Sequence, residues 1–252
     1  MIIHKKLVVP DEQELYIFGD IHGDYDAFKA MLKLIGAQPQ DYIIGTGDLI
    51  DRGAGIVPLL FDFLHKPNYH AVIGNHEEMM IHVDKPYNRD LWLHMGNGGD
   101  KTLEQLGWEG IKYFTDKILK KFPLILEIHH RNKVFGVIHA GVPLFYENTK
   151  TWKDIITLAK KDEDYRNQLL EDRDLIRRLQ RMRQGTTQEQ QDAFNQFEAI
   201  QGIDYVIHGH TGVVEPFIHH NMIWLDTMFL ARTFTVLNFN EKTQQINFLI
   251  NE

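Results

Sequence analysis

The sequence has no cysteine among its 252 residues. Disulfide bonds, thiolate metal ligands and a cysteine nucleophile are therefore all excluded. The lack of disulfides agrees with a reducing compartment, so we expect a cytoplasmic protein.

Long apolar runs are also missing. No stretch approaches the roughly 18 consecutive apolar residues that a membrane-spanning helix needs. The first residues, MIIHKKLVVPDEQ, contain neither a long apolar segment nor a small-residue cleavage site. We therefore expect no signal peptide and no membrane partner.

A surplus of positive charge is missing as well. Lysine and arginine number 27 against 35 aspartate and glutamate residues, which gives a formal net charge of −8. Nucleic acids and acidic membranes bind to basic surfaces, so we expect neither as a partner. Because the whole chain is acidic, a phosphate site would need its own local positive charges.

What remains is an ordinary globular composition, with 43% hydrophobic and 25% charged residues. The length allows a sizeable core. We expect residues 1–252 to form one domain and the protein to be a monomer.

The first part of the chain alternates between strand and helix patterns. Short apolar runs that end in glycine predict strands at 15–19, 41–47 and 69–74, and apolar residues at helical spacing predict helices at 27–36 and 56–64. This alternation is typical of a parallel sheet, whose functional loops gather at the carboxyl ends of the strands.

The rest of the chain has a helical middle and a strand-rich end. The patterns predict two helices within 98–122, an antiparallel pair at 122–128 and 133–141, a helical cap or insertion at about 143–200, and strands at 203–211, 216–226, 232–240 and 244–250. The pairs His129-His130 and His219-His220 fall at expected hairpin turns, where we expect them to be exposed.

Metal-capable side chains follow five of the predicted strands, in the segments GDIHGD, GDLIDRG, GNHE, VIHAG and VIHGHT. A single aspartate in such a place is usually a helix cap, and a single histidine is usually a core residue. Repetition at five strand ends argues against both explanations, because parallel strands bring these ends together. The candidate ligands are Asp20, His22, Asp48, Asn75, His139, His210 and also His208.

Carboxylates, imidazoles and an amide without sulfur suit Mn²⁺, Fe or Zn²⁺. Seven candidates exceed what one ion needs, whereas two ions about 3.5–4 Å apart and bridged by a carboxylate would use them. Asp48 is the natural bridge because it follows the middle of the three leading strands. We expect two divalent ions, with Mn²⁺ as the first choice, that hold a hydroxide and neutralise a phosphoryl group.

The three leading motifs are separated by 28 residues (Asp20 to Asp48) and 27 residues (Asp48 to Asn75). With FPLILEI, VIHAGVP and HGHT…WLDT, they resemble the calcineurin-like metallophosphoesterases, more narrowly the PPP-type serine/threonine protein phosphatases, and most closely the phage lambda-type protein phosphatase. The resemblance implies an α/β fold, with a central β-sandwich of mixed sheets flanked by helices and a dinuclear metal site at the carboxyl ends of the strands.

The resemblance also implies a role for each matching residue. Metal one would be held by Asp20, His22 and Asp48, and metal two by Asp48, Asn75, His139 and His210. His76 would be the general acid that protonates the leaving oxygen, Asp51 would orient it, and Arg52 would bind phosphate.

The family has a second phosphate-binding arginine, usually in a Trp-x-Arg context, which the segment DLIRRLQRMRQG lacks. We select Arg183, with Arg178 and Arg181 as rivals, although each could equally lie on a solvated helix face. Two further departures are His208, which we interpret as a supporting or structural residue, and Met228-Phe229, which replaces the Gly-Ala that often follows WLDT in the family.

The implied activity is hydrolysis of phosphomonoesters, with phosphoserine and phosphothreonine of proteins as the expected substrates. The alternative is a dinucleoside polyphosphate hydrolase or another small-molecule phosphoesterase. The motif DRG at 51–53 favours the phosphatase, whereas RMR at 181–183 keeps the alternative open. A non-catalytic metal-binding scaffold is disfavoured, because the acid, the bridge and both ligand sets are all present.

Overall fold

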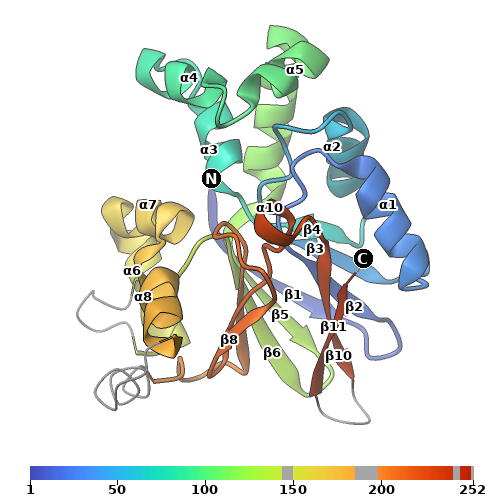
Figure 1. Ribbon diagram of the computed structural model, residues 1–252, viewed down its shortest axis with the longest axis vertical. Coiled ribbons are helices and arrows are strands. Elements are labelled where there is room, and N and C mark those ends of the chain that lie inside the picture. The colour runs from blue at the N-terminus through green and yellow to red at the C-terminus, as the bar shows by residue number, and fades with distance from the viewer. Residues whose placement is uncertain (144–149, 185–197, 241–244, 251–252) are drawn as a thin grey trace.

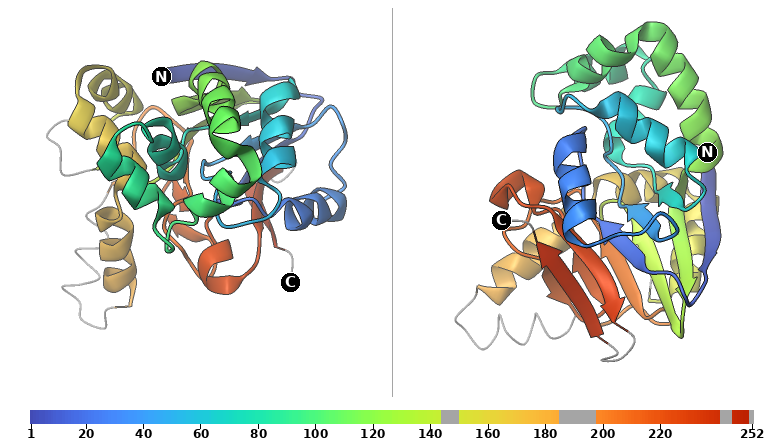
Figure 2. Two further views of the ribbon diagram at one scale, coloured as in Figure 1. Left: turned by 90° about the horizontal axis from the view of Figure 1, so that it is seen from above. Right: turned by 90° about the vertical axis from the view of Figure 1, so that its right-hand side faces the viewer.

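The computed structural model describes residues 1–143, 150–184, 198–240 and 245–250. Two β-sheets pack face to face, and helices cover their outer faces and one end (Figures 1 and 2). In Figure 1 the helices α2 to α5 gather above the strands, and α6 to α8 lie to the left of them. This arrangement confirms the predicted mixed sheets flanked by helices.

The strands and helices follow one another along the whole described chain. The strands are β1 Ile2–Val9, β2 Leu15–Phe18, β3 Tyr42–Gly45, β4 Tyr69–Ala71, β5 Pro123–His130, β6 Lys133–Ile138, β7 Tyr205–His208, β8 Phe217–His219, β9 Met222–Trp224, β10 Thr235–Asn240 and β11 Gln245–Ile250. The helices are α1 Tyr25–Leu34, α2 Ile56–His65, α3 Asn75–Ile81, α4 Pro86–Leu93, α5 Gly99–Lys121, α6 Trp152–Lys161, α7 Glu163–Glu171, α8 Asp174–Arg183 and α10 Met228–Ala231.

The first sheet has the strand order β11-β10-β2-β3-β4. The strands β2, β3 and β4 are parallel, as the alternating pattern predicted, and β10 joins β2 in the antiparallel sense. Phe18, Gly45 and Ala71 lie in register across the three parallel strands. The loops that follow these strands therefore start side by side.

The second sheet has the order β1-β5-β6-β7-β9-β8. The strands β5 and β6 form the predicted antiparallel pair, and β7 runs parallel to β6. The strand β1, which pairs with β5, is absent from the sequence prediction. Its sequence IIHKKLVV lacks a clean alternation, because most of its side chains are only half-buried at the edge of the sheet.

Two apolar layers hold the architecture together. Inward-facing residues of both sheets, such as Ile17, Ile44 and Phe135, form the interior of the sandwich. A second cluster joins the outer faces of the sheets to the helices, through residues such as Phe28 of α1 and Phe63 of α2. No helix among the described residues is long and apolar enough to cross a membrane.

Three helices occupy the described part of the segment predicted as a helical cap. The helix α6 packs beside β1, and α7 and α8 lie with it on the left of the strands in Figure 1, with the start of α8 at a cavity lined by candidate metal ligands and its end at Phe217 of β8. Thr151 caps α6 and Asp162 caps α7 through their side-chain oxygens. Residues 144–149 and 185–197 of the predicted cap lie outside the described residues.

The histidine pairs at the hairpins correct one expectation. His130 and His219 are buried in β5 and β8 instead of lying exposed in the turns. The turns begin one residue later, at Arg131 and His220, whose backbones have positive φ values of 54° and 51°. The strand β5 thus extends two residues beyond its predicted end at 128, and the single strand predicted at 216–226 is divided by its turn into β8 and β9.

A buried carboxylate, Glu127 of β5, lies on the outer face of the second sheet. It accepts hydrogen bonds from Trp152 Nε1 at 2.9 Å and His129 Nε2 at 2.7 Å, and Lys6 Nζ lies 2.8 Å away. Burial alone would raise the pKa of this carboxyl, but the hydrogen bonds from Lys6, Trp152 and His129 outweigh it and lower the pKa from 4.5 to about 2.

We predict that Glu127→Gln lowers the free energy of unfolding at pH 7 and that this deficit shrinks in acid. A carboxyl whose pKa is depressed on folding stabilises the protein above its unfolded pKa, and this stabilisation is lost as the pH falls from about 5 toward 2. Urea unfolding of both proteins between pH 7 and pH 3 measures the difference. The exposed Glu12→Gln serves as the control and should show no such trend; a pH-independent deficit for Glu127→Gln would contradict the assignment.

Candidate metal centre

Loops from both sheets meet at one end of the sandwich and bring the predicted residues together. A cavity of about 340 Å³ is lined there by Asp20, His22, Asp48, His76 and His210. The ligand atoms of His22, Asp48 and His76, and those of Asp48, His139 and His210, lie within 4.8 Å of one another in each set. Residues from the ends of β2, β3, β4, β6 and β7 therefore converge, as the strand-end motifs predicted.

Asp48 stands between the two sets of candidate ligands. Its Oδ1 lies 3.4 Å from His139 Nε2, and its Oδ2 lies 3.6 Å from His22 Nε2. On the side of Oδ1, the amide oxygen of Asn75 lies 3.0 Å from His139 Nε2 and 3.1 Å from His210 Nδ1. Each oxygen of Asp48 thus faces a different group of ligand atoms, which is the arrangement a bridging carboxylate needs.

Backbone carbonyls orient the three histidines. His22 Nδ1 lies 2.9 Å from the Ile50 carbonyl, His139 Nδ1 lies 2.8 Å from the Thr46 carbonyl, and His210 Nε2 lies 3.3 Å from the Glu171 carbonyl. A carbonyl oxygen only accepts, so each of these nitrogens donates its hydrogen there. The other nitrogen of each ring is left with its lone pair directed at the common centre, as in metal-bound histidines. This donor set fits a pair of divalent cations.

The protonation states of the ligands agree with this interpretation. Burial lowers the pKa of His22 to about 3 and that of His210 to about 2, so both rings are neutral at neutral pH, the form that binds metals. Burial would also lower the pKa of His139, but the carboxylates of Asp48 and Asp20 raise it to about 10. A cation would take the place of that proton.

Asp20 lines the same pocket and is held by the loop after β7. Its carboxylate accepts the backbone N–H of His210 at 3.0 Å and the hydroxyl of Thr46 at 3.3 Å. Burial, followed by the charge of the nearby carboxylate Asp226, raises its pKa well above the ordinary value. Two buried carboxylates that repel each other are costly unless a positive charge lies between or beside them.

The candidate general acid His76 forms a buried pair with Asp51. His76 Nδ1 lies 2.6 Å from Asp51 Oδ2, and Asp51 also accepts hydrogen bonds from Trp92 Nε1, at 3.0 Å, and from the hydroxyl of Thr102. Burial alone would lower the pKa of His76, but Asp48 and Asp51 raise it, which favours the protonated ring. Sequence reasoning missed Trp92 and Thr102, which lie 41 and 51 residues from Asp51.

Arg52 is positioned by the turn Asn97-Gly98-Gly99. Its backbone N–H donates to the carbonyl of Gly98 at 3.2 Å, and a Cβ on Gly98 would lie 2.8 Å from that nitrogen. Gly98 also has a φ of +80°, which a side chain would strain. The guanidinium of Arg52 reaches His76, with Nη2 3.3 Å from Nε2. The glycine turn therefore gives Arg52 room beside His76, the candidate general acid.

The loop that carries Asp48 is held by one buried carboxylate. Glu77 Oε2 accepts the backbone N–H groups of Asp48 and Gly74, both at 2.9 Å, and Oε1 accepts those of Leu49 at 2.8 Å and Ile50 at 3.2 Å. Eight non-glycine residues in the described parts of the chain have positive φ, and five of them belong to the site: His22, Asp48, Asp51, Arg52 and His210. Such strain persists where the surroundings enforce it.

The structure does not bring Arg183 to the metal cavity. Its guanidinium lies over the ring of Phe217, 5.2 Å from the centroid, and it lines a separate cavity. Of the described arginines, those that line the metal cavity are Arg52, Arg173 and Arg177. Arg173 Nη1 donates to the carbonyl of His210 at 3.0 Å. The rivals Arg178 and Arg181 are not among the lining residues.

His208 lies behind the site. It is fully buried in β7, its Nδ1 lies 3.2 Å from the carbonyl of Ile138, and its ring stacks on Trp224 with the centroids 4.9 Å apart. Burial lowers its pKa to about 3, so the ring is neutral. These contacts agree with a structural role and place it outside both ligand sets.

Comparison with known proteins identifies the class. The sequence model described as "Calcineurin-like phosphoesterase" matches residues 14–214, and the chain belongs to this family of metal-dependent hydrolases of phosphoric esters.

Within this class, named relatives are phosphatases and nucleotide hydrolases. The chain is 27% identical over 230 residues to "Serine/threonine-protein phosphatase 1" of Salmonella typhimurium, covering 89% of this chain and 91% of that protein. It is 30% identical over 143 residues to "Serine/threonine-protein phosphatase 2" of Escherichia coli, covering 56% of this chain and 64% of that protein. It is 32% identical over 154 residues to "Bis(5'-nucleosyl)-tetraphosphatase, symmetrical" of Wigglesworthia glossinidia brevipalpis, covering 59% of this chain and 50% of that protein.

Solved structures support the fold. A Saccharomyces cerevisiae protein serine/threonine phosphatase superposes with a TM-score of 0.64 at 15% identity, covering 100% of this chain and 83% of that one. A putative diadenosine tetraphosphatase superposes with a TM-score of 0.56 at 16% identity, covering 98% of each chain. Both structures thus share the overall fold of this chain.

We predict that Glu77→Gln destabilises the protein by about 1–3 kcal/mol, because a glutamine amide keeps only one accepting oxygen and leaves backbone N–H groups without a partner. Urea denaturation measures the change. The same variant should bind metal more weakly, since Asp48 loses its fixed position.

The neighbouring Glu78→Gln is the matched control. Glu78 is half-buried and its Oε1 lies 2.9 Å from His82 Nε2 in an (i, i+4) pair of α3. Its loss should change stability by about 0.5 kcal/mol or less. Equal effects of the two substitutions would show that Glu77 does not hold the loop.

Proposed function

We propose that this protein is a dinuclear metal-dependent phosphatase that hydrolyses phosphomonoesters, with phosphoserine and phosphothreonine of proteins as its substrates. The observation that carries the proposal is the position of Asp48. One of its oxygens faces His139 and the other faces His22, while the His76–Asp51 pair lies beside them.

We assign the first cation to Asp20, His22 and Asp48, and the second to Asp48, Asn75, His139 and His210; Mn²⁺ is our first choice for both. Bound there, two such cations would supply a water activated as the nucleophile and would offset the negative charge of a phosphoryl group. Asn75 contributes an oxygen without a charge, which limits the repulsion among the buried carboxylates.

The remaining residues bind the substrate and move one proton. His76, held by Asp51 through Nδ1, presents Nε2 to the pocket and protonates the leaving oxygen. Arg52 and Arg173 hold the phosphoryl oxygens as forks of donors. We place Arg173 in the role that the sequence pattern suggested for Arg183, because Arg173 lines the pocket and contacts the His210 loop.

Two observations favour a protein substrate over a dinucleoside polyphosphate. Asp51 of the DRG motif is engaged with His76, and the match to the Salmonella phosphatase extends over 91% of that protein. The RMR segment that kept the nucleotide alternative open carries Arg183, which lies against Phe217, away from the metal cavity. The tetraphosphatase relatives keep that alternative as the second candidate.

The test is a comparison of substrates on one preparation. Purified protein with Mn²⁺ should hydrolyse p-nitrophenyl phosphate, lose activity with a chelator and recover it with added Mn²⁺. It should cleave phosphoserine and phosphothreonine peptides with a higher kcat/KM than diadenosine tetraphosphate. Absence of turnover with Mn²⁺, Fe²⁺ and Zn²⁺ alike would sink the catalytic proposal, and the reverse order of kcat/KM would favour the second candidate.

We predict that His76→Asn lowers kcat by about 10²–10⁴-fold, the usual contribution of a general acid. Metal content, measured on the same preparation by elemental analysis, should be unchanged because His76 is not assigned to either cation. Loss of bound metal would show instead that His76 is a ligand.

We predict that Arg173→Ala lowers kcat/KM by about 10–100-fold, because a charge-assisted contact with the phosphoryl group is lost. Arg183→Ala, on the same helix α8, is the matched control and should stay within about twofold of the wild type. Because Arg173 also contacts the His210 loop, metal content is measured in parallel. A larger loss in the Arg183 variant would restore the assignment made from the sequence.

A further inference from the structure

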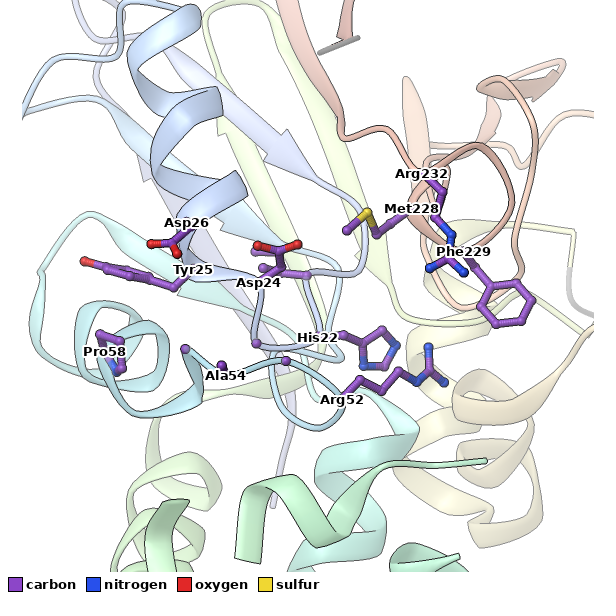
Figure 3. A pocket seen from close by; sticks show the side chains of 14 residues that line it. His22, Asp24, Tyr25, Asp26, Arg52, Ala54, Pro58, Met228, Phe229 and Arg232 are labelled. Carbon is purple, nitrogen blue, oxygen red and sulfur yellow. The ribbon is translucent and has the colours of Figure 1, made fainter. Parts of the chain in front are cut away.

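A second and larger cavity, of about 560 Å³, adjoins the metal cavity (Figure 3). It lies between the start of α1, the loop before α2 and the short helix α10. Three residues, His22, Arg52 and Phe229, line both cavities. The two spaces therefore meet at a candidate metal ligand and a candidate phosphate-binding arginine.

The floor of this cavity is rigid because two functional loops are fastened together there. Gly53 N–H donates to the His22 carbonyl at 2.9 Å, and Gly55 N–H donates to the Gly23 carbonyl at 2.8 Å. A Cβ on Gly53 would lie 2.4 Å from the Gly23 carbonyl carbon, so the loops touch backbone to backbone. The floor and the metal-binding loops are thus one continuous surface.

Apolar side chains line two opposite sides of the cavity, and Asp24, Asp26 and Arg232 add charged groups to its lining (Figure 3). Tyr25 lies at one end, fixed by its hydroxyl, which donates to Asp62 Oδ2 at 3.2 Å, with Pro58 beside it. Met228 and Phe229 of α10 lie at the other end, beside Arg52 (Figure 3). Phe229 is 60% exposed, so its ring is accessible at the place where the two cavities meet.

The position of Arg52 links this cavity to the reaction. Its Nη2 lies 3.3 Å from Nε2 of the general acid His76, and its guanidinium lies 5.8 Å from the centroid of the Phe229 ring. In hydrolysis the P–O bond to the leaving group breaks, a water oxygen joins the phosphorus, and the leaving oxygen takes the proton from His76. The leaving oxygen therefore departs beside Arg52, at the mouth of the second cavity.

We propose that this cavity binds the leaving group of the substrate and that Phe229 is a specificity-determining residue that favours planar aromatic groups. The proposal rests on the proposed function, since it assumes that a phosphoryl group occupies the metal cavity. An apolar cavity with a few polar groups is the usual form of a small-ligand site. The exposed ring of Phe229 offers a stacking face to a second ring, and Met228 offers a sulfur contact.

The test separates the phosphoryl site from the leaving-group cavity by means of unreactive phosphonates. Methylphosphonate contacts only the metal cavity, whereas 1-naphthylphosphonate also places a ring in the second cavity. Their dissociation constants for the Mn²⁺-loaded protein are measured by calorimetry. We expect Phe229→Ala to raise the dissociation constant of 1-naphthylphosphonate by about 5–20-fold, because an aromatic contact and its buried area are lost. The dissociation constant of methylphosphonate should stay within about twofold of the wild-type value.

Leu230→Ala is the matched control, because Leu230 is the next residue of α10, is similarly exposed, and lines only the metal cavity. It should leave the ratio of the two dissociation constants unchanged. Ala54→Phe tests the cavity from the opposite wall. Because the larger side chain fills the space, it should weaken binding of 1-naphthylphosphonate but not of methylphosphonate. An unchanged ratio in both Phe229→Ala and Ala54→Phe, with metal content intact, would overturn the proposal.

The source of the aromatic group follows from kinetics on two substrate pairs. The first pair is a phosphothreonine peptide with phenylalanine or alanine next to the phosphorylated residue, and the second is adenosine monophosphate and ribose 5-phosphate. If Phe229→Ala loses the preference for the aromatic member of a pair, the proposal is supported. The pair that is affected then shows whether the cavity accepts a peptide side chain or a nucleobase. If the protein binds 1-naphthylphosphonate selectively but turns over no phosphoester, the cavity still binds aromatic groups and the proposed function is refuted.

Discussion

The geometry of the whole site depends on the carboxylate of Glu77. Its two oxygens accept four backbone N–H groups, three from residues 48–50 and one from Gly74. Asp48 has a positive φ of 50°, and these bonds, together with those from the backbone of Ile21 and His22 to its carbonyl, help to hold its loop in that conformation. The same carboxylate ties that loop to the turn that carries Asn75 and His76. One buried side chain therefore helps to set the spacing between Asp48, Asn75 and His76, the residues that we assign as the bridging carboxylate, an amide ligand and the general acid.

A second constraint is electrostatic. The chain is acidic overall, with a net charge of −8, and Asp20, Asp48, Asp51 and Asp226 are buried within this one region. Burying several carboxylates is unfavourable unless cations or hydrogen-bond donors compensate them. Asp51 has Trp92 and Thr102 as donors. Burial, followed by the charge of Asp226, raises the pKa of Asp20, and burial together with the charge of Asp48 raises the pKa of Asp226. The negative charge of these buried carboxylates lies at the place to which we assign the divalent cations. Bound cations would therefore compensate it.

The sequence allowed the strand-end residues to be predicted because each follows a short apolar run, and parallel strands must bring such ends together. Asp20, His22 and Asp48 could be predicted in this way. Trp92 was not, because α4 has a mostly polar sequence in which this tryptophan is the one buried residue, and nothing local links it to Asp51. The partners of a buried carboxylate are set by tertiary packing, which no local pattern encodes.

The arginines show a different limit. Arg173, Arg177 and Arg183 all lie in or directly before α8, and composition alone does not distinguish them. Helical spacing places Arg173, Arg177 and Gln180 toward the metal cavity, while Arg183 reaches Phe217. To decide which of these arginines lines the metal cavity, the orientation of α8 must be known. That orientation depends on how α7 and α8 pack. Without the tryptophan of the family motif, the sequence offered no signal for that choice.

Chemistry and selectivity are built from different parts of the molecule. The residues assigned to catalysis come from loops at strand ends, fixed by Glu77, Asp51 and backbone hydrogen bonds. The residues that border the substrate come from additions to that frame, namely α8 on one side and α10 on the other. Phe229 of α10 lines both the metal cavity and the larger one, and its ring is largely exposed. Under the proposed function, we expect substitutions at Phe229 to change which leaving group fits and to leave in place the loops that carry the candidate metal ligands, so that different residues would govern substrate choice and bond cleavage.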